Sequence, residues 1–148
     1  MRQEVFSAVS FLSGLLRHRK ALTPDELDRF SSCLFNVLTT RYSNHWFPEH
    51  PFKGSAFRCI RIVKRTLDPV VVSAAVEAGI AESRLQQLLP NELTLWVDPD
   101  EVSYRFGEDG SIGVVEIPSS ARPTDSNCRN EHHKFTEFTD VMSTAIAV

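Results

Sequence analysis

His45 and Cys59 are the two residues of this sequence that could form a nucleophilic pair. In such a pair an imidazole accepts the proton of a thiol, and the thiolate then attacks an electrophile. Nothing near them in the sequence would orient the imidazole, and Cys59 stands among apolar neighbours. We therefore keep an enzyme centred on this pair as a minor hypothesis and expect a protein without catalytic residues.

Cys128, His132 and His133 could ligate a metal ion, because thiolates and imidazoles are the usual ligands of zinc. Three ligands without a fourth make a weak site. The sequence also has no zinc-finger spacing of Cys and His and no glycine-rich loop for phosphate. We expect neither a metal ion nor a cofactor.

Trp96 is the aromatic residue that its surroundings single out. The alternation of a strand places Leu93, Leu95 and Val97 on one face, which belongs to the core. Trp96 then lies on the opposite face with Thr94. A tryptophan there either packs under a helix or is exposed as an anchor for a partner protein, and the strand alone leaves both open.

A basic cluster follows Phe57 and consists of Arg58, Arg61, Lys64 and Arg65. If this segment is a strand, alternation sends Arg58 and Arg61 to opposite faces, so we do not expect a continuous groove for nucleic acid. The 16 Lys+Arg against 19 Asp+Glu, a net charge of −3, also argue against binding nucleic acid through the overall field.

Leu85, Leu88 and Leu89 form an LxxLL motif. On a helix this spacing places three leucines on one side, where they could fill the groove of a receptor. A helix that packs into a protein core shows the same spacing, and we favour the core.

The composition is that of one soluble domain, with 148 residues, 42% of them hydrophobic and 24% charged. No stretch approaches the ~18 apolar residues of a membrane span. The N-terminus does not resemble a signal peptide, and three widely spaced cysteines favour a reducing compartment. We therefore expect a small intracellular domain.

Two helices open the predicted fold. Residues 4–19 carry apolar side chains at helical spacing. The second helix begins with a capping box, in which Thr23 is the N-cap, Pro24 the first helical residue and Glu26 the third, and it ends near Tyr42. These helices should form a hairpin.

The character of the sequence changes after the hairpin. Pro48, Pro51 and Gly54 exclude a regular helix between His45 and the following strand. Residues 57–63 alternate as a strand does.

The remaining elements are short. A helix is expected between Asp68 and Gly79, and the others are a helix at 83–89 and strands at 93–97, 101–106 and 111–117. This order indicates an α+β fold, an N-terminal helical hairpin with further short helices packed on a small, mainly antiparallel sheet. Residues 118–148 are polar and lack a period, so we expect a flexible C-terminal tail.

Two long segments resemble the signature boxes of the BTG/Tob antiproliferative family. They are residues 45–62, HWFPEHPFKGSAFRCIRI, and residues 89–110, LPNELTLWVDPDEVSYRFGEDG. The resemblance covers residues 1–117, which we take as a BTG/Tob-type domain. It is greatest to the shorter BTG branch, because of the stretch VSYRFGEDGSI.

The resemblance implies an adaptor without catalytic activity that restrains cell proliferation. Such proteins bind the Caf/Pop-type catalytic deadenylase subunit of the Not complex and promote shortening of mRNA poly(A) tails. They occur in the cytoplasm and the nucleus. No membrane and no direct contact with nucleic acid are implied.

The family's partner-contacting residues can be carried over to this sequence. Its tryptophan in the second box is matched by Trp96, and its tyrosine in the first box by Phe57, which lacks the hydroxyl. Asp98 is expected as a polar contact at the rim, and Asp100 stands where close relatives often have tyrosine. Residues 118–148 do not show the C-terminal box that is associated with poly(A)-binding protein.

The alternative function is a nuclear transcriptional co-regulator. Several members of the family have been described in that role, and the partners would be transcription factors or nuclear receptors. The binding residues would be Leu85, Leu88 and Leu89.

Overall fold

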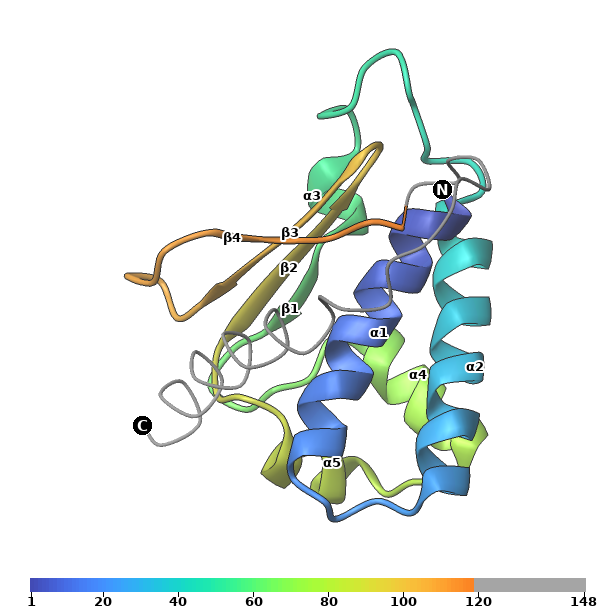
Figure 1. The fold of residues 1–148 in the computed structure, drawn as a ribbon, viewed down its shortest axis with the longest axis vertical. Helices are drawn as coiled ribbons and strands as arrows, with labels where there is room; N and C mark the ends of the chain where they lie inside the picture. Colours follow the sequence, from blue (N-terminus) through green and yellow to red (C-terminus); the bar gives the residue numbers. More distant parts are fainter. Residues whose placement is uncertain (119–148) are drawn as a thin grey trace, which may run out of the picture. The chain divides into compact units, whose positions relative to one another are not determined.

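A layer of helices packs on one face of a four-stranded antiparallel sheet in residues 1–118, the part of the chain that the computed structural model describes. Figure 1 shows the long helices gathered on one side of the sheet. The predicted α+β class and the N-terminal helical hairpin are both confirmed. Residues 119–148, including the metal-site candidates and the expected tail, lie outside the described residues.

The hairpin consists of α1 (Arg2–His18) and α2 (Pro24–Tyr42). The predicted capping box is present. Thr23 Oγ1 accepts a hydrogen bond from the Glu26 backbone N–H at 3.2 Å, and the Glu26 carboxylate accepts one from the Thr23 N–H at 2.8 Å. Two of the amides that a helix start leaves unpaired are thereby satisfied.

The strand predicted at 57–63 is wrong in its first half. A one-turn helix, α3 (Ser55–Arg58), comes first, and β1 covers only Ile60–Ile62. Gly54 starts the turn at φ +77°, a left-handed conformation that suits glycine. Phe57 and Arg58 therefore project from a helix, not from a pleated strand.

The two short helices were predicted within one residue of their ends. They are α4 (Pro69–Ala78) and α5 (Glu82–Leu88). Asp68 Oδ1 accepts from the Val70 N–H at 3.1 Å, as an N-cap does, and Gly79 ends α4 at φ +74°.

The rest of the sheet is a meander of three strands. They are β2 (Leu93–Asp98), β3 (Glu101–Phe106) and β4 (Gly113–Val115), and the order across the sheet is β1-β2-β3-β4. The register pairs Trp96 with Ser103. The last strand is shorter than the predicted 111–117.

The core lies between the sheet and the helices. The inner face of β1 and β2 and the apolar stripes of the hairpin helices bury side chains that are at most 2% exposed, among them Leu12, Leu15, Leu16, Phe30, Leu34, Leu38, Ile60, Ile62, Leu93 and Leu95. Helix α1 contacts β2, β3 and β4, and α2 packs on both α1 and α4. Within residues 1–118, no helix is long and apolar enough to cross a membrane.

Candidate partner-binding site

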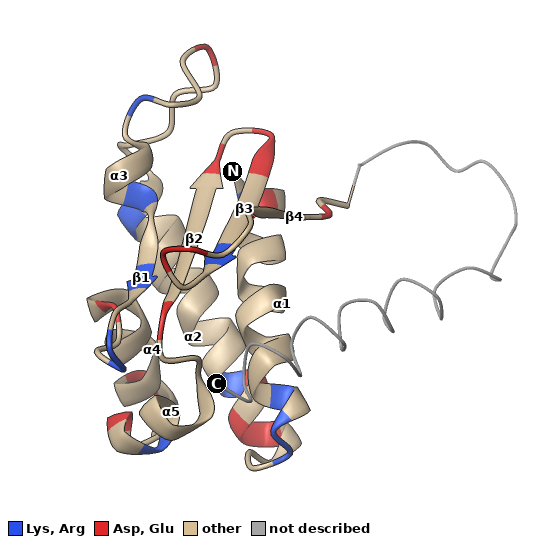
Figure 2. Ribbon diagram, turned by 90° about the vertical axis from the view of Figure 1, so that its left-hand side faces the viewer, with Lys and Arg blue, Asp and Glu red and all other residues tan. Residues whose placement is uncertain are grey.

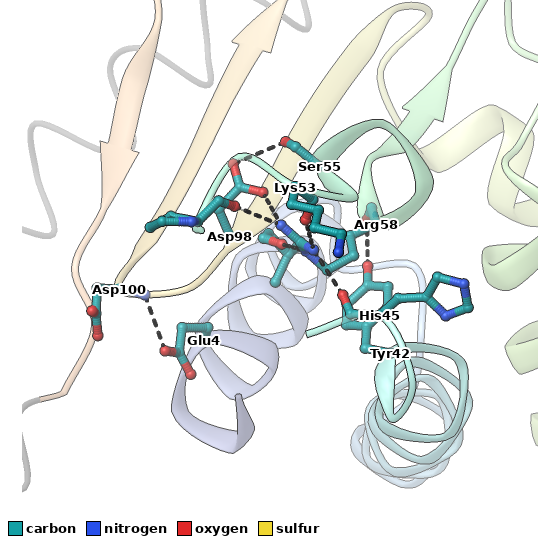
Figure 3. Close-up of polar contacts among 10 residues, drawn as sticks. Glu4, Tyr42, His45, Lys53, Ser55, Arg58, Asp98 and Asp100 are labelled. Atoms are coloured by element: carbon teal, nitrogen blue, oxygen red, sulfur yellow. Dashed lines mark hydrogen bonds and ion pairs between the residues drawn. The ribbon is translucent and has the colours of Figure 1, made fainter. Parts of the chain in front are cut away.

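Arg58 is the largest completely buried side chain of the described residues, and it organises one end of the sheet. Its Nε atom donates to the carbonyl of Val97 at 2.8 Å. The two terminal nitrogens reach the chain that precedes α3 and the end of β2, and their acceptors are His45 O, Lys53 O, Pro51 O and Asp98 Oδ1 at 2.7 to 2.9 Å. All five N–H donors of a guanidinium are thus used. Figure 3 shows this network.

Tyr42 holds the backbone of Arg58. Its hydroxyl donates to the Arg58 carbonyl, and its ring is fully buried at the end of α2. Burial raises the pKa of the Tyr42 phenol well above its usual value, and the charge of Asp68 adds to that shift. The phenol thus stays protonated, and able to donate, at pH values above the ordinary pKa of about 10.

Phe57 lies on the surface of α3 between two side chains. The ring of His45 stacks on it with centroids 3.9 Å apart, and the Arg41 guanidinium lies 4.3 Å from its centroid. The phenylalanine remains 37% exposed. A ring that neighbours fix in orientation and leave accessible can serve as a binding anchor.

Trp96 is half-buried, and the alternation along β2 places it on the face opposite to the buried Leu95 and Val97. The alternation in β2 buries Leu95 and Val97 and leaves Trp96 partly accessible. The strand pattern predicts its face and leaves its accessibility open. The Arg105 guanidinium of β3 lies 5.6 Å from the centre of its ring. Helix α3 contacts β2, the strand that carries Trp96.

Asp98 is turned inward at the end of β2. Its carboxylate accepts from Arg58 at 2.7 Å and from the Ser55 hydroxyl at 3.0 Å, and the residue is 7% exposed. The geometry gives Asp98 a clear role in fixing α3 to β2. A direct contact with a partner at the rim stays a prediction.

The His45–Cys59 arrangement does not resemble an activated thiol. Burial raises the pKa of the Cys59 thiol to about 11, so that it is protonated at neutral pH, whereas a nucleophilic cysteine has a lowered pKa. The Nδ1 atom of His45 is buried without a hydrogen-bond partner among the described residues, so no acceptor fixes the tautomer of the ring as a general base requires.

The LxxLL motif lies on α5 and in the turn that follows it. Leu85 is completely buried and Leu89 is 3% exposed, whereas Leu88 is half-buried. The salt bridge of Arg84 with Glu26, at 2.7 Å, holds α5 against the start of α2. Docking of these leucines in a receptor groove would first require α5 to leave the core.

The predicted basic cluster is divided by the structure. Arg58 is buried, so its charge is not available on the surface, and the reason is the short helix that the sequence did not indicate. Arg61 is exposed on β1, and Arg65 donates to Asn91 Oδ1 at 2.7 Å. Figure 2 shows the basic positions following α3 and β1, and acidic ones at the turn between β2 and β3.

A shallow groove between α2 and α4 was not foreseen from the sequence. Its volume is about 440 Å³, and it is lined by Asn36, Val37, Thr40, Arg41, Pro69, Val70, Ser73 and Glu77. Within residues 1–118 there is no cluster of His, Cys, Asp and Glu suited to a metal ion.

The role of Arg58 was also missed by sequence reasoning. An arginine beside an apolar run is usually solvated, and only the folded backbone brings five acceptors to this one. The single available signal was the carboxylate of Asp98 directly after the predicted strand at 93–97.

The comparisons with known proteins agree with the fold. The sequence model of the BTG family matches residues 1–116. The chain is 50% identical over 133 residues to Protein BTG2 of Homo sapiens, covering 88% of this chain and 84% of the relative. It is 47% identical over 127 residues to Protein BTG1 of Gallus gallus, covering 86% and 74% of the two chains.

A solved structure is similar as well. The BTG/Tob domain of FOG-3 from C. elegans superposes with a TM-score of 0.70 at 27% sequence identity. The match covers 80% of this chain and 91% of that one.

Proposed function

The chain belongs to the BTG family, and from this premise we propose that it is a non-enzymatic antiproliferative adaptor that binds the Caf/Pop-type catalytic deadenylase subunit of the Not complex. By holding that subunit on target mRNAs, it would promote poly(A) shortening and restrain cell proliferation. Its places of action would be the cytoplasm and the nucleus.

The observation that carries this proposal is the state of two aromatic side chains. Phe57 and Trp96 each keep part of the ring accessible, on two elements that pack against each other, α3 and β2. Aromatic residues held in one orientation lose little conformational entropy on binding, which is why tryptophan and tyrosine dominate the binding energy of many interfaces.

The electrostatic surroundings of the two rings support the same site. Arg41 lies over Phe57 and Arg105 over Trp96, so each anchor has a cation beside it. A partner that brings carboxylates to the rim of its binding surface would be attracted to these positions and oriented by them. Phe57 keeps the aromatic ring of the family's tyrosine but has no hydroxyl with which to form a hydrogen bond to the partner.

The test is direct binding of the full chain to the purified catalytic deadenylase subunit. Trp96→Ala should abolish capture, and Phe6→Ala is the matched control, because Phe6 is a 54% exposed phenylalanine on α1. A reporter mRNA to which the chain is tethered should lose its poly(A) tail faster with wild type than with Trp96→Ala. Equal capture of wild type and Trp96→Ala would contradict the proposed site.

A receptor-binding co-regulator remains the alternative, and the burial of Leu85 and Leu89 does not favour it. It would be supported by a stable Leu88→Ala variant that loses a nuclear receptor and keeps the deadenylase subunit.

A further inference from the structure

The side chain of Phe52 is highly exposed, whereas hydrogen bonds hold the backbone on both sides of it. Its side chain is 83% exposed, the highest value among the large hydrophobic residues of the described chain. Single exposed hydrophobic residues are ordinary and indicate nothing by themselves. The backbone that carries this one, however, is held on both sides.

Arg58 supplies the restraint. Its guanidinium donates to the carbonyl of Pro51 at 2.9 Å and to that of Lys53 at 2.7 Å, the two residues that flank Phe52. The carbonyl of Phe52 itself accepts from the Ser55 N–H at 3.2 Å. Three consecutive carbonyls are therefore hydrogen-bonded, and two of them to a side chain that is completely buried.

The restraint extends to the side chains around the tip of this loop. The Lys53 ammonium lies 4.3 Å from the centre of the Phe47 ring, and the Lys53 N–H donates to the His50 carbonyl at 2.9 Å. A loop tip without such bonds pays conformational entropy when a partner orders it. Here the loop is already ordered by folding, so that less conformational entropy is lost when a partner binds the protruding phenyl ring.

The loop that carries Phe52, residues 45–53, leads directly to Phe57, one of the two partly exposed aromatic residues of the proposed binding site. Phe52 precedes α3 by one turn of chain, and Phe57 is on α3 itself. His45, at the other end of the loop, stacks on Phe57 and gives its carbonyl to Arg58. Figure 3 shows how His45, Lys53 and Asp98 converge on this arginine.

We propose that Phe52 is a third anchor of the interface with the catalytic deadenylase subunit, inserting its ring into an apolar pocket of that subunit, and that Arg58 is the positioning residue that presents it. This inference rests on the proposed function, because it takes the same partner. The buried Arg58 then contributes to recognition of the partner as well as to the stability of the fold.

The first experiment compares Phe52→Ala with Phe6→Ala in the full chain. Binding to the immobilised catalytic subunit is measured together with the melting temperature. We expect Phe52→Ala to weaken binding by about tenfold or more, mainly through faster dissociation, with an unchanged melting temperature. Phe6→Ala should bind as wild type does.

The outcomes distinguish a failure of the Phe52 anchor from a failure of the proposed adaptor function. If Trp96→Ala loses binding and Phe52→Ala does not, Phe52 is no anchor and the adaptor function stands. If wild type fails to bind the subunit, both fall together.

The second experiment tests the positioning role by a double-mutant cycle. Arg58→Lys keeps the charge beside Asp98 but has too few donors for the loop carbonyls. It should weaken binding several-fold in the wild-type background and clearly less when Phe52 is already alanine. Equal losses in both backgrounds would show that Arg58 does not act through Phe52. Should Arg58→Lys fail to fold, the comparison of Phe52→Ala with Phe6→Ala decides the anchor role.

Discussion

Arg58 and Asp98 form a buried ion pair that joins α3 to the end of β2, with 2.7 Å between the guanidinium nitrogen and the carboxylate oxygen. The arginine is completely inaccessible to water and the aspartate nearly so. The attraction within such a buried pair adds little net stability. Removing one partner is nevertheless strongly destabilising, because the remaining charge is left in the interior without water to solvate it.

The first prediction follows from this pair. Asp98→Ala should lower the free energy of unfolding by about 3–5 kcal/mol, since it leaves the Arg58 charge uncompensated. Asp98→Asn should cost less, because the amide oxygen still accepts a hydrogen bond. Urea unfolding at pH 7 measures both, and Glu26→Gln, at the partly exposed pair with Arg84, is the control with a much smaller expected change. Equal stability of wild type and Asp98→Ala would contradict the network.

The second prediction concerns Trp96. Truncation to alanine should reduce the affinity for the catalytic deadenylase subunit by roughly thirtyfold or more. This corresponds to a loss of about 2 kcal/mol of binding free energy, which is usual when a central anchor is removed. The domain should stay folded, because Trp96 lies on the outer face of the sheet. Circular dichroism measures whether the variant is folded, and binding to the immobilised subunit measures its affinity. Gross unfolding would place Trp96 in the core instead.

The third prediction distinguishes the leucines of the LxxLL motif. Leu85→Ala should lower the free energy of unfolding by about 2–5 kcal/mol, as for other buried leucines. Leu88→Ala should cost less, because Leu88 is half-buried. Thermal unfolding of the two variants gives the order directly, and an equal or reversed order would show that α5 packs differently.

The fourth prediction is a dependence on pH that comes from Tyr42. Burial raises the pKa of its phenol, so the folded chain binds this proton more tightly than the unfolded chain, in which the pKa is about 10. The resulting stability is fully present below pH 10 and is lost as the pH rises further. Tyr42→Phe, which lacks the hydrogen bond to Arg58, should be less stable than wild type by about 1 kcal/mol at pH 7.

The difference between wild type and Tyr42→Phe should narrow above pH 10, because the variant has no phenol to ionise there. Urea unfolding of both proteins between pH 7 and pH 11 measures this difference in the free energy of unfolding. A constant difference across this range would show that the Tyr42 proton is not held more tightly in the folded chain.

The fifth prediction concerns the C-terminal residues. A chain ending at Ile117 should melt within a few degrees of the full chain and still bind the deadenylase subunit. The described domain already contains the contact that closes it, in which the Ser7 hydroxyl of α1 donates to the Glu116 carbonyl at 3.3 Å. A clear fall in melting temperature on truncation would contradict this boundary.

Local signals were enough to predict most of the secondary structure. The capping box at Thr23, the N-cap at Asp68 and the left-handed stop at Gly79 each depend on residues within one turn, and all three are confirmed. The outward placement of Trp96 depends on a period of two along a single strand, which the sequence also displays.

The structure around Arg58 could not be predicted in the same way. Its acceptors come from residues that are between 5 and 40 positions away along the chain. The helical turn of α3 and the burial of a charged side chain depend on those distant contacts, and they override the strand-like alternation that begins at Phe57. The exposure of Phe52 was missed for the same reason.

The five hydrogen bonds of Arg58 also limit how the loop before α3 can change in evolution. Surface loops commonly accept insertions and deletions, because their backbone groups exchange freely with water. Between His45 and Lys53, however, a single added or lost residue would move at least one carbonyl away from the guanidinium. A buried donor would then be unpaired, so the length of this loop should be as strictly inherited as the residues of the core.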